Sequence, residues 1–473
     1  MTTTIDAASE TVSTLRPALR TVTVENPAPH ARTDWVTFTA PVEAIKLDVG
    51  LQRMLGPFPV HLGRTVSWSV HRPGIPSVVR LHARVSIGAL ERQTWPLTVA
   101  AGAVAPQPLP DLSDTSAAPV VRLWINGNVW DAEPTLLADG PATILHMRGR
   151  VPGTQCVGEF WAQIYPGSPV VPWELLVVAS DPSTPEVYQA ISSIVLEVVG
   201  DVVVSPYWPA WRGARQVAPN VVELARSTTM ADTQGLAWAG VAIASAAAGA
   251  GAALHGPLCA VLSRNAWDGH WGPFGRLPDA VPIAESATYV DRLLGWHRDT
   301  LIGGDVWRKP RLGLQPNSGQ TGAQDDFGAT KMGWAWAGGP LHILEAYHSA
   351  LHEACRPGHW RDADGFPVEP WDHPNHVTWD GYTHWHPSVS GDRMGKGSAA
   401  TPRFSGGYIG PDREHWSNNL LCGTYLLTGS PLLRRLIEKQ GRQILSGETV
   451  DPRLSTSNAG APRGVGRTML AAA

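Results

Sequence analysis

Histidine and tryptophan are concentrated in one stretch of this chain, from His342 to Asn419. Nine of the 17 histidines lie between His342 and His415, and seven tryptophans lie in and around this stretch, from Trp334 to Trp416. The centre of the stretch reads HPNHVTWDGYTHWH, residues 373–386. Aromatic rings can stack on the apolar faces of sugars, while imidazoles and carboxylates beside them hold hydroxyl groups or move protons. We therefore expect a chemical site in this stretch, with a carbohydrate as its ligand.

One chemistry that this stretch could perform is the elimination reaction of a polysaccharide lyase. A base must remove the proton next to a uronate carboxylate, a cation must stabilise the resulting enolate, and an acid must protonate the leaving oxygen. The catalytic candidates are His376, His384 and His386 as base, Tyr382 as acid, and Arg393 or Lys396 as cation.

Hydrolysis is the alternative chemistry, and it would need two carboxylates several ångströms apart. Asp380, Asp392 and Asp412 are the local candidates. The residues expected to bind the substrate are Trp379, Trp385, Asp380, Asp412, His415 and Asn418. A loop packed by its own tryptophans, with no ligand, remains open as a third interpretation, although long irregular loops inside compact domains are usually functional.

A metal site is a weaker hypothesis. His348 and His352 are four residues apart on an expected helix, which can bring two imidazoles to one ion, and Glu345 lies one turn earlier. However, His348 also falls on the apolar stripe of that helix, which favours a histidine packed in the core. His384 and His386 lack a third ligand nearby in the sequence. We expect no metal and no cofactor.

The region before this stretch has the pattern of antiparallel β-sheets. Short apolar runs alternate with polar residues and are bounded by Pro and Gly, as in SVVRLHARVS at 77–86. An Asn126–Gly127 pair predicts a hairpin. The expected strands include Trp35–Phe38, Val66–Val70, Val78–Ile87, Trp95–Val99, Val120–Ile125, Ala142–Arg148, Gly158–Tyr165, Trp173–Ala179, the long run Ile191–Val204, Val221–Ala225, Leu236–Ser245 and Leu258–Ser263.

Helical patterns begin at about Gly338. Leu341, Leu344, His348, Leu351 and Cys355 would form the buried stripe of a first helix. A second helix is expected from about Asp412 to Leu427, ended by Thr428–Gly429. Ser430 is expected to cap a third helix that begins at Pro431. The fold class that follows is a multidomain, mainly β chain, with two antiparallel β domains and then a small α-helical, α/α-toroid-like region.

The expected domain boundaries follow the changes in composition. They are an extended N-terminal arm at 1–33, a β domain at 34–110, a β-sandwich at 111–330, a helical region at 331–447 and a flexible tail at 448–473. Pro106–Pro119, rich in Pro, Asp and Ser, marks the first internal boundary.

Composition excludes several classes of function. The net charge is −4, and five lysines with scattered arginines form no basic stripe, so no nucleic-acid partner is expected. Cys156, Cys259, Cys355 and Cys422 form no CxxC pair, and buried free thiols are expected. The polar, Thr-rich N-terminus does not have the pattern of a Sec signal, which predicts a soluble, cytoplasmic or virion-associated protein.

A membrane span is not expected either. Gly235–Leu254 has no charged residue and the length to cross a bilayer. Ala and Gly dominate it, however, and no positive charges flank it, so we expect buried strand or another packed element there.

The order of elements resembles the exo-rhamnogalacturonan lyase (YetA-like) family. The residues that carry the resemblance are GPFPVH at 56–61, DREHWSNNLL at 412–421 and YLLTG at 425–429, together with the Trp- and His-rich loop. The resemblance implies a rift-barrel-like first domain, a central β-sandwich and a C-terminal (α/α) toroid. A toroid of six helical hairpins needs roughly 300 residues. With about 130 residues after Gly338, the toroid here is expected to be truncated.

Two functions follow as hypotheses. The first is a carbohydrate-active or carbohydrate-binding protein resembling polysaccharide lyases, acting on or attaching to a surface polysaccharide. The second is a non-catalytic structural virion protein of a tailed bacteriophage, as a tail, fibre or capsid-decorating component. In either case we expect a homo-oligomer or a complex with other subunits of a larger assembly.

Overall fold

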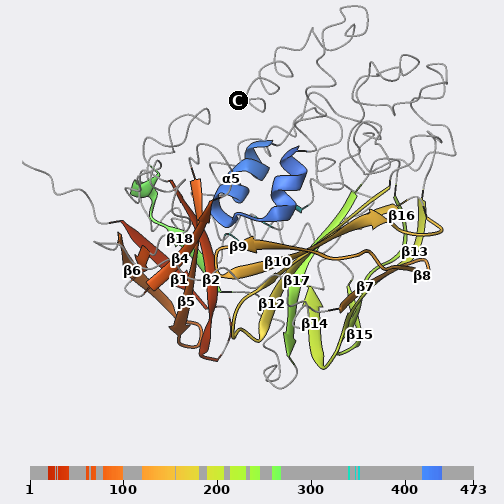
Figure 1. Ribbon diagram of the computed structural model, residues 1–473, viewed down its shortest axis with the longest axis horizontal. Helices are drawn as coiled ribbons and strands as arrows, with labels where there is room; N and C mark the ends of the chain where they lie inside the picture. The colour runs from red at the N-terminus through yellow and green to blue at the C-terminus, as the bar shows by residue number, and fades with distance from the viewer. Residues whose placement is uncertain are drawn as a thin grey trace, which may run out of the picture.

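The computed structural model describes the β regions and parts of the helical region. The described residues are 20–26, 28, 30–41, 60–62, 65–70, 78–99, 120–154, 156–179, 189–206, 214–230, 235–244, 258–267, 339–340, 343, 347, 350–351 and 418–438. Within them the chain is mainly β, as predicted, and every strand pairing is antiparallel (Figure 1).

Seven strands form a first sheet, in the hydrogen-bonded order β18-β1-β6-β3-β4-β5-β2. Its two end strands, β18 and β2, also contact each other, so the sheet curls around its own core. The bounds are β1 Thr21–Glu25, β2 Arg32–Pro41, β3 Val60–Leu62, β4 Thr65–Val70, β5 Val78–Ile87, β6 Arg92–Val99 and β18 Cys259–Leu262. A short 3-10 helix, Arg264–Ala266, follows β18.

This first sheet draws on distant parts of the chain. β1 lies in the segment expected to be an extended arm, and β18 lies in the segment expected to belong to the sandwich. The backbone register joins them directly, with Val22 opposite Leu262 and Glu25 opposite Cys259. Ser263 Oγ accepts a hydrogen bond from the backbone N–H of Thr21 at 3.0 Å.

The remaining strands form two sheets that pack face to face. The six-stranded sheet has the order β14-β17-β12-β11-β10-β9, and the five-stranded sheet has the order β15-β16-β13-β7-β8. Side chains from both sheets share one core, which includes Trp130, Phe160, Trp173 and Trp238. The bounds are β7 Val120–Ile125, β8 Asn128–Trp130, β9 Thr135–Asp139, β10 Ala142–Arg150, β11 Cys156–Ile164, β12 Val170–Ala179, β13 Gln189–Val199, β14 Val202–Pro206, β15 Arg215–Ala218, β16 Val221–Met230 and β17 Gly235–Ala244.

The long apolar run Ile191–Val204 is two strands rather than one. Gly200, with a φ of 130°, turns the chain between β13 and β14. β13 then pairs within the five-stranded sheet, whereas β14 pairs with β17 in the six-stranded sheet. The prediction of a single run was wrong because a continuous apolar pattern does not show where a chain passes from one sheet to the other.

The predicted hairpin at Asn126–Gly127 is confirmed. Both residues have positive φ, 53° and 80°, as the mirror-image turns of two-residue hairpins require. The side-chain oxygen of Asn126 also accepts a hydrogen bond from the backbone N–H of Ser192 at 2.8 Å. The turn therefore joins β7 to β8 and holds the start of β13.

The helices form a tight hairpin on the outer face of the six-stranded sheet. α5, Asn418–Thr428, is followed by a helix at 431–438. Gly429, with a φ of 65°, ends α5, and Ser430 caps the next helix by accepting a hydrogen bond from the N–H of Leu433 at 3.0 Å. Both features follow the sequence prediction. The predicted helix start at Asp412, like the wider toroid, lies outside the described residues.

The first expected helix is described at four positions, residues 343, 347, 350 and 351, which have helical backbone. Ile343, Tyr347, Ala350 and Leu351 are all buried, against the sheets and α5. Leu351 was predicted in this stripe, while Leu341, Leu344, His348 and Cys355 lie outside the described residues. No helix in the described part of the chain is long and apolar enough to cross a membrane.

Two of the four cysteines are buried free thiols, as predicted. Cys156 and Cys259 are both buried and unbridged, and burial raises the pKa of the Cys156 thiol to about 12. Cys422, in α5, is also a free thiol and is partly buried, and Cys355 lies outside the described residues.

Gly240 in β17 is required by the packing of Trp173. A Cβ at position 240 would lie 2.2 Å from the carbonyl oxygen of Ser205 and 2.4 Å from the Trp173 ring. At Gly149 in β10, a Cβ would make only ordinary contacts, at 3.4 Å and beyond.

We therefore expect Gly240→Ala to lower the free energy of unfolding by about 3 kcal/mol, because the strand or the indole must move. Gly149→Ala is the matched control and should change it by less than about 1 kcal/mol. Urea unfolding followed by tryptophan fluorescence measures both. Equal effects of the two substitutions would contradict the assignment of close packing at Gly240.

Candidate functional site

The residues predicted as a site from the sequence lie almost entirely outside the described part of the chain. This applies to the catalytic candidates His376, Tyr382, His384, His386 and Arg393, and to Trp379, Asp380, Trp385, Asp412 and His415. Asn418 is the first residue of α5. Their roles stay predictions, and the described residues present a different candidate site.

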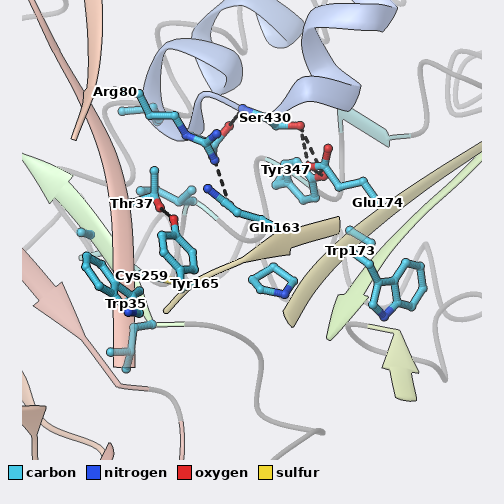
Figure 2. Close-up of a pocket in the computed structure, with 17 residues that line it drawn as sticks. Trp35, Thr37, Arg80, Gln163, Tyr165, Trp173, Glu174, Cys259, Tyr347 and Ser430 are labelled. Atoms are coloured by element: carbon cyan, nitrogen blue, oxygen red, sulfur yellow. Dashed lines mark hydrogen bonds between the residues drawn. The ribbon is translucent and has the colours of Figure 1, made fainter. Parts of the chain in front are cut away.

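That site is a cavity of about 140 Å³ where the two β units meet the helices (Figure 2). Strands β2 and β5 contribute residues from the face that points away from the core of the first sheet. Strands β11, β12 and β17 contribute from the six-stranded sheet. The wall is completed by β18, by the helical residues Ile343 and Tyr347, by α5 and by Ser430, the cap of the helix at 431–438. The polar lining residues are Thr37, Arg80, Gln163, Tyr165, Glu174, Tyr347, Thr428 and Ser430.

The cavity opens where two strands stop pairing. The β11–β12 ladder runs only as far as Ala162 opposite Trp173. The next residue outward on β12 is Pro172, which lacks the backbone N–H that a further ladder bond would use. Gln163 and Tyr165, just beyond the last pair, therefore lie beside the cavity together with Pro172.

Arg80 of β5 joins the two β units. Its guanidinium forms an ion pair with Asp139 of β9 and donates a hydrogen bond from Nη2 to Gln163 Oε1 at 3.1 Å. Arg80 is only 6% exposed. A buried guanidinium needs such partners, because an unpaired buried charge is strongly unfavourable.

Tyr165 is the second link between the units. Its hydroxyl is hydrogen-bonded to Thr37 Oγ1 at 2.6 Å and to His82 Nδ1 at 2.9 Å. Its ring stacks on Trp35, with ring centroids 5.0 Å apart and planes 10° from parallel. The indole N–H of Trp35 also donates to the carbonyl of Pro166 at 3.3 Å. Strand β2 is thus fixed against the turn that follows β11.

His82 is completely buried behind this link, and it is neutral. Burial lowers the pKa of His82 to about 4, because a charged imidazole would lose its hydration. The Asp139 carboxylate, 3.8 Å from Nε2, acts in the opposite direction but is shared with Arg80.

Glu174 of β12 holds the helices against the sheet. Its carboxylate accepts hydrogen bonds from Ser430 Oγ at 2.7 Å, from the backbone N–H of Leu432 at 2.9 Å and from the Tyr347 hydroxyl. The carboxylate thus lies at the N-terminus of the helix at 431–438, where the helix dipole favours negative charge. Burial raises the pKa of Glu174, while these three donors act to lower it.

Three buried side-chain nitrogen atoms of the residues that line the cavity have no hydrogen-bond partner among the described residues. They are Nε of Arg80, Nε2 of Gln163 and Nε1 of Trp173. Buried donors are almost always paired, so these unsatisfied donors mark the walls of the cavity as a candidate site. The described residues contain no group of three or more His, Cys, Asp or Glu side chains placed to hold a metal ion.

Sequence reasoning missed this site for a physical reason. The alternation in β5 predicted a half-buried strand with one polar face. Arg80 and His82 are on that polar face, but the structure buries both of them. A charged residue inside an apolar run, such as Glu174 in VVPWELLVVA, was the available signal. The sequence could not show that these strands meet.

Comparison with known proteins does not assign this site to a family. No protein-family model matches the chain, and no curated protein matches it either.

The protonation of His82 gives a test of this geometry. Because its pKa is lower in the folded state than in the unfolded chain, the unfolded state binds the proton more readily, and stability is lost as the pH falls from about 6.5 towards 4.

We expect His82→Asn, which keeps a hydrogen-bonding atom near Tyr165 but cannot titrate, to remove this loss. Between pH 7 and pH 4 the wild type should lose about 3 kcal/mol relative to the variant, at 1.4 kcal/mol for each tenfold change in proton affinity. Urea unfolding at a series of pH values measures the difference. If the difference in free energy of unfolding between the wild type and the variant is the same at pH 7 and pH 4, His82 is not buried as described.

Proposed function

We propose that this chain is a carbohydrate-binding protein that uses the cavity between its two β units and its helices. The observation that carries the proposal is that polar and aromatic side chains line one cavity together. Arg80, Gln163 and Glu174 bring hydrogen-bonding groups to its wall, and Trp35, Tyr165 and Tyr347 bring aromatic rings to it. Sugars need both kinds of surface, because their rings have polar edges and apolar faces.

The sequence resemblance supports the same proposal. Two antiparallel β units followed by a helical hairpin occur in the order that the YetA-like lyases would have. We propose that the first unit corresponds to the rift-barrel-like domain, the second to the sandwich and the helices to part of the toroid. Polysaccharide would then be the natural partner, attached to a cell surface or in solution.

Binding can be tested with a panel of purified polysaccharides and a matched pair of variants. Gln163→Ala removes an amide from the cavity wall. We expect it to lower the affinity for the polysaccharide at least tenfold, measured in affinity electrophoresis by how strongly a gel that contains the polysaccharide retains the protein. Gln93→Ala is the control, because Gln93 lies in β6 and hydrogen-bonds to Glu91 rather than to the cavity.

Equal retention of both variants would place binding elsewhere on the chain. No retention of the wild type by any polysaccharide in a broad panel would contradict carbohydrate binding itself.

Lyase activity is the catalytic form of this proposal, and the histidine-rich loop would perform it. Incubation with acidic polysaccharides should then release an unsaturated uronate, detected by its ultraviolet absorbance. His376→Ala, His384→Ala and Tyr382→Phe should each reduce the rate at least a hundredfold, because each would remove a proton-transfer group. Unchanged rates in all three would exclude this loop as the catalytic site.

A second function, a structural subunit of a tailed-phage particle, is favoured by a separate observation. On the outer face of the five-stranded sheet, Val120 and Val199 are directly opposite each other and are 54% and 39% exposed. Val129, opposite Trp124 on the same face, is 37% exposed. The ion pair of Arg122 with Glu197 lies between these valines on the same face, so the face combines exposed apolar and charged groups. We propose that this face contacts another subunit. Stable multimers without polysaccharide retention would favour this function over the first.

A further inference from the structure

The described residues that line the cavity bring it no net positive charge. Among them, Arg80 is the cation and Glu174 is the anion. Arg80 is already paired with Asp139, so one positive charge faces two negative ones when Glu174 is ionised. If Glu174 is protonated, the charges of Arg80 and Asp139 cancel and the sum of the three charges is zero. His82, directly behind Arg80 and Asp139, contributes no charge because burial lowers its pKa to about 4.

This balance is unfavourable for an acidic ligand. A carboxylate brought into the cavity would meet a guanidinium whose charge Asp139 already neutralises, and it would lie in the same cavity as the Glu174 carboxylate. Two carboxylates in one buried site repel each other, and a buried anion without its own counter-ion is strongly disfavoured.

The size of the cavity also restricts its ligand. Its volume is about 140 Å³. Pockets for drug-sized ligands are larger, from about 300 Å³ upwards. The cavity therefore suits a small ligand such as one sugar ring, with any further residues of a chain lying outside it.

The polar groups around the cavity match hydroxyl groups. Among the described lining residues, the Arg80 guanidinium and the Gln163 amide nitrogen can only donate, whereas the ionised Glu174 carboxylate can only accept. A hydroxyl group both accepts and donates, so neighbouring hydroxyls on one ring can satisfy both kinds of partner. Ile343, Leu427 and Leu258 supply apolar contact for the C–H groups of the same ring. Figure 2 shows Arg80, Gln163 and Glu174 around this space.

We propose that this cavity binds one uncharged, hydroxyl-bearing sugar ring and discriminates against the corresponding uronate. The inference rests on the carbohydrate binding proposed above and narrows it to neutral pyranosides. It concerns the cavity alone and makes no assumption about which part of a polysaccharide the histidine-rich loop binds.

The test compares matched ligands on the full chain. The methyl glycosides of glucose, galactose and mannose are titrated calorimetrically at pH 7 beside the methyl glycosides of the corresponding uronates. Each pair differs only in having a hydroxymethyl or a carboxylate group at one ring carbon. We expect at least one neutral glycoside to bind at least tenfold more tightly than its uronate.

Two variants test whether the cavity charges cause the preference. Asp139→Asn frees the charge of Arg80, and Glu174→Gln removes the anion that lines the cavity; both are close in shape to the wild type. Each substitution should lower the ratio of the uronate's dissociation constant to that of the neutral glycoside at least tenfold. Glu197→Gln is the matched control on the five-stranded sheet, where Glu197 pairs with Arg122, and it should leave the preference unchanged.

Tighter binding of the uronate by the wild type overturns the inference, as does a preference that both cavity variants leave unchanged. If Glu174→Gln fails to fold because the helices detach, Asp139→Asn decides the result alone.

The inference and the proposed function can fail separately. If polysaccharides are retained but no monosaccharide glycoside binds, the inference fails, while carbohydrate binding stands at another site. If neither polysaccharides nor glycosides bind, both fail.

Discussion

The buried carboxylate of Glu174 is the interaction on which the arrangement of this protein depends. It projects from the centre of the six-stranded sheet and accepts hydrogen bonds from the helix at 431–438, from its cap residue Ser430 and from Tyr347. A carboxylate without these donors would be unstable at this depth, and a helix N-terminus without the carboxylate would leave N–H groups unsatisfied. Each element therefore fixes the other, and the position of the helices determines one wall of the cavity.

A second charged contact holds the same helix. Arg435 donates from Nε to Glu159 of β11 at 2.8 Å, and Glu159 also lies 3.0 Å from His146 Nε2. The helix at 431–438 is thus attached at its first turn and again one turn later, to two neighbouring strands. With Arg80 and Tyr165 joining the two β units, three parts of the chain meet around a single polar centre. A binding site at their junction follows from this arrangement, because polar groups that hold the parts together also line the space between them.

The sequence was sufficient for most local structure. Alternation identified β5 and β7, Asn126–Gly127 identified a hairpin, and Ser430 with Gly429 identified the break between two helices, because each of these depends on residues close in the chain. The division of Ile191–Val204 between two sheets was not predictable, since it depends on which strands become neighbours. The same limit explains the cavity. Arg80, Gln163 and Glu174 come from three strands of two sheets, and no spacing in the sequence relates them. The histidine-rich loop remains a prediction.

The pairing of β1 with β18 has a consequence for how the chain folds during synthesis. Thr21 and Ser263 are hydrogen-bonded across 242 positions, so the first sheet to be translated is the last that can be completed. The strands of the sandwich, from Val120 to Ala244, leave the ribosome in between and pair only with one another. Long-range pairing of this kind is slow, because the chain must close a large loop before any contact compensates for the lost entropy. Until β18 emerges, one side of β1 has no partner strand among those described, and the nascent N-terminal region is open to association with other chains or to chaperones.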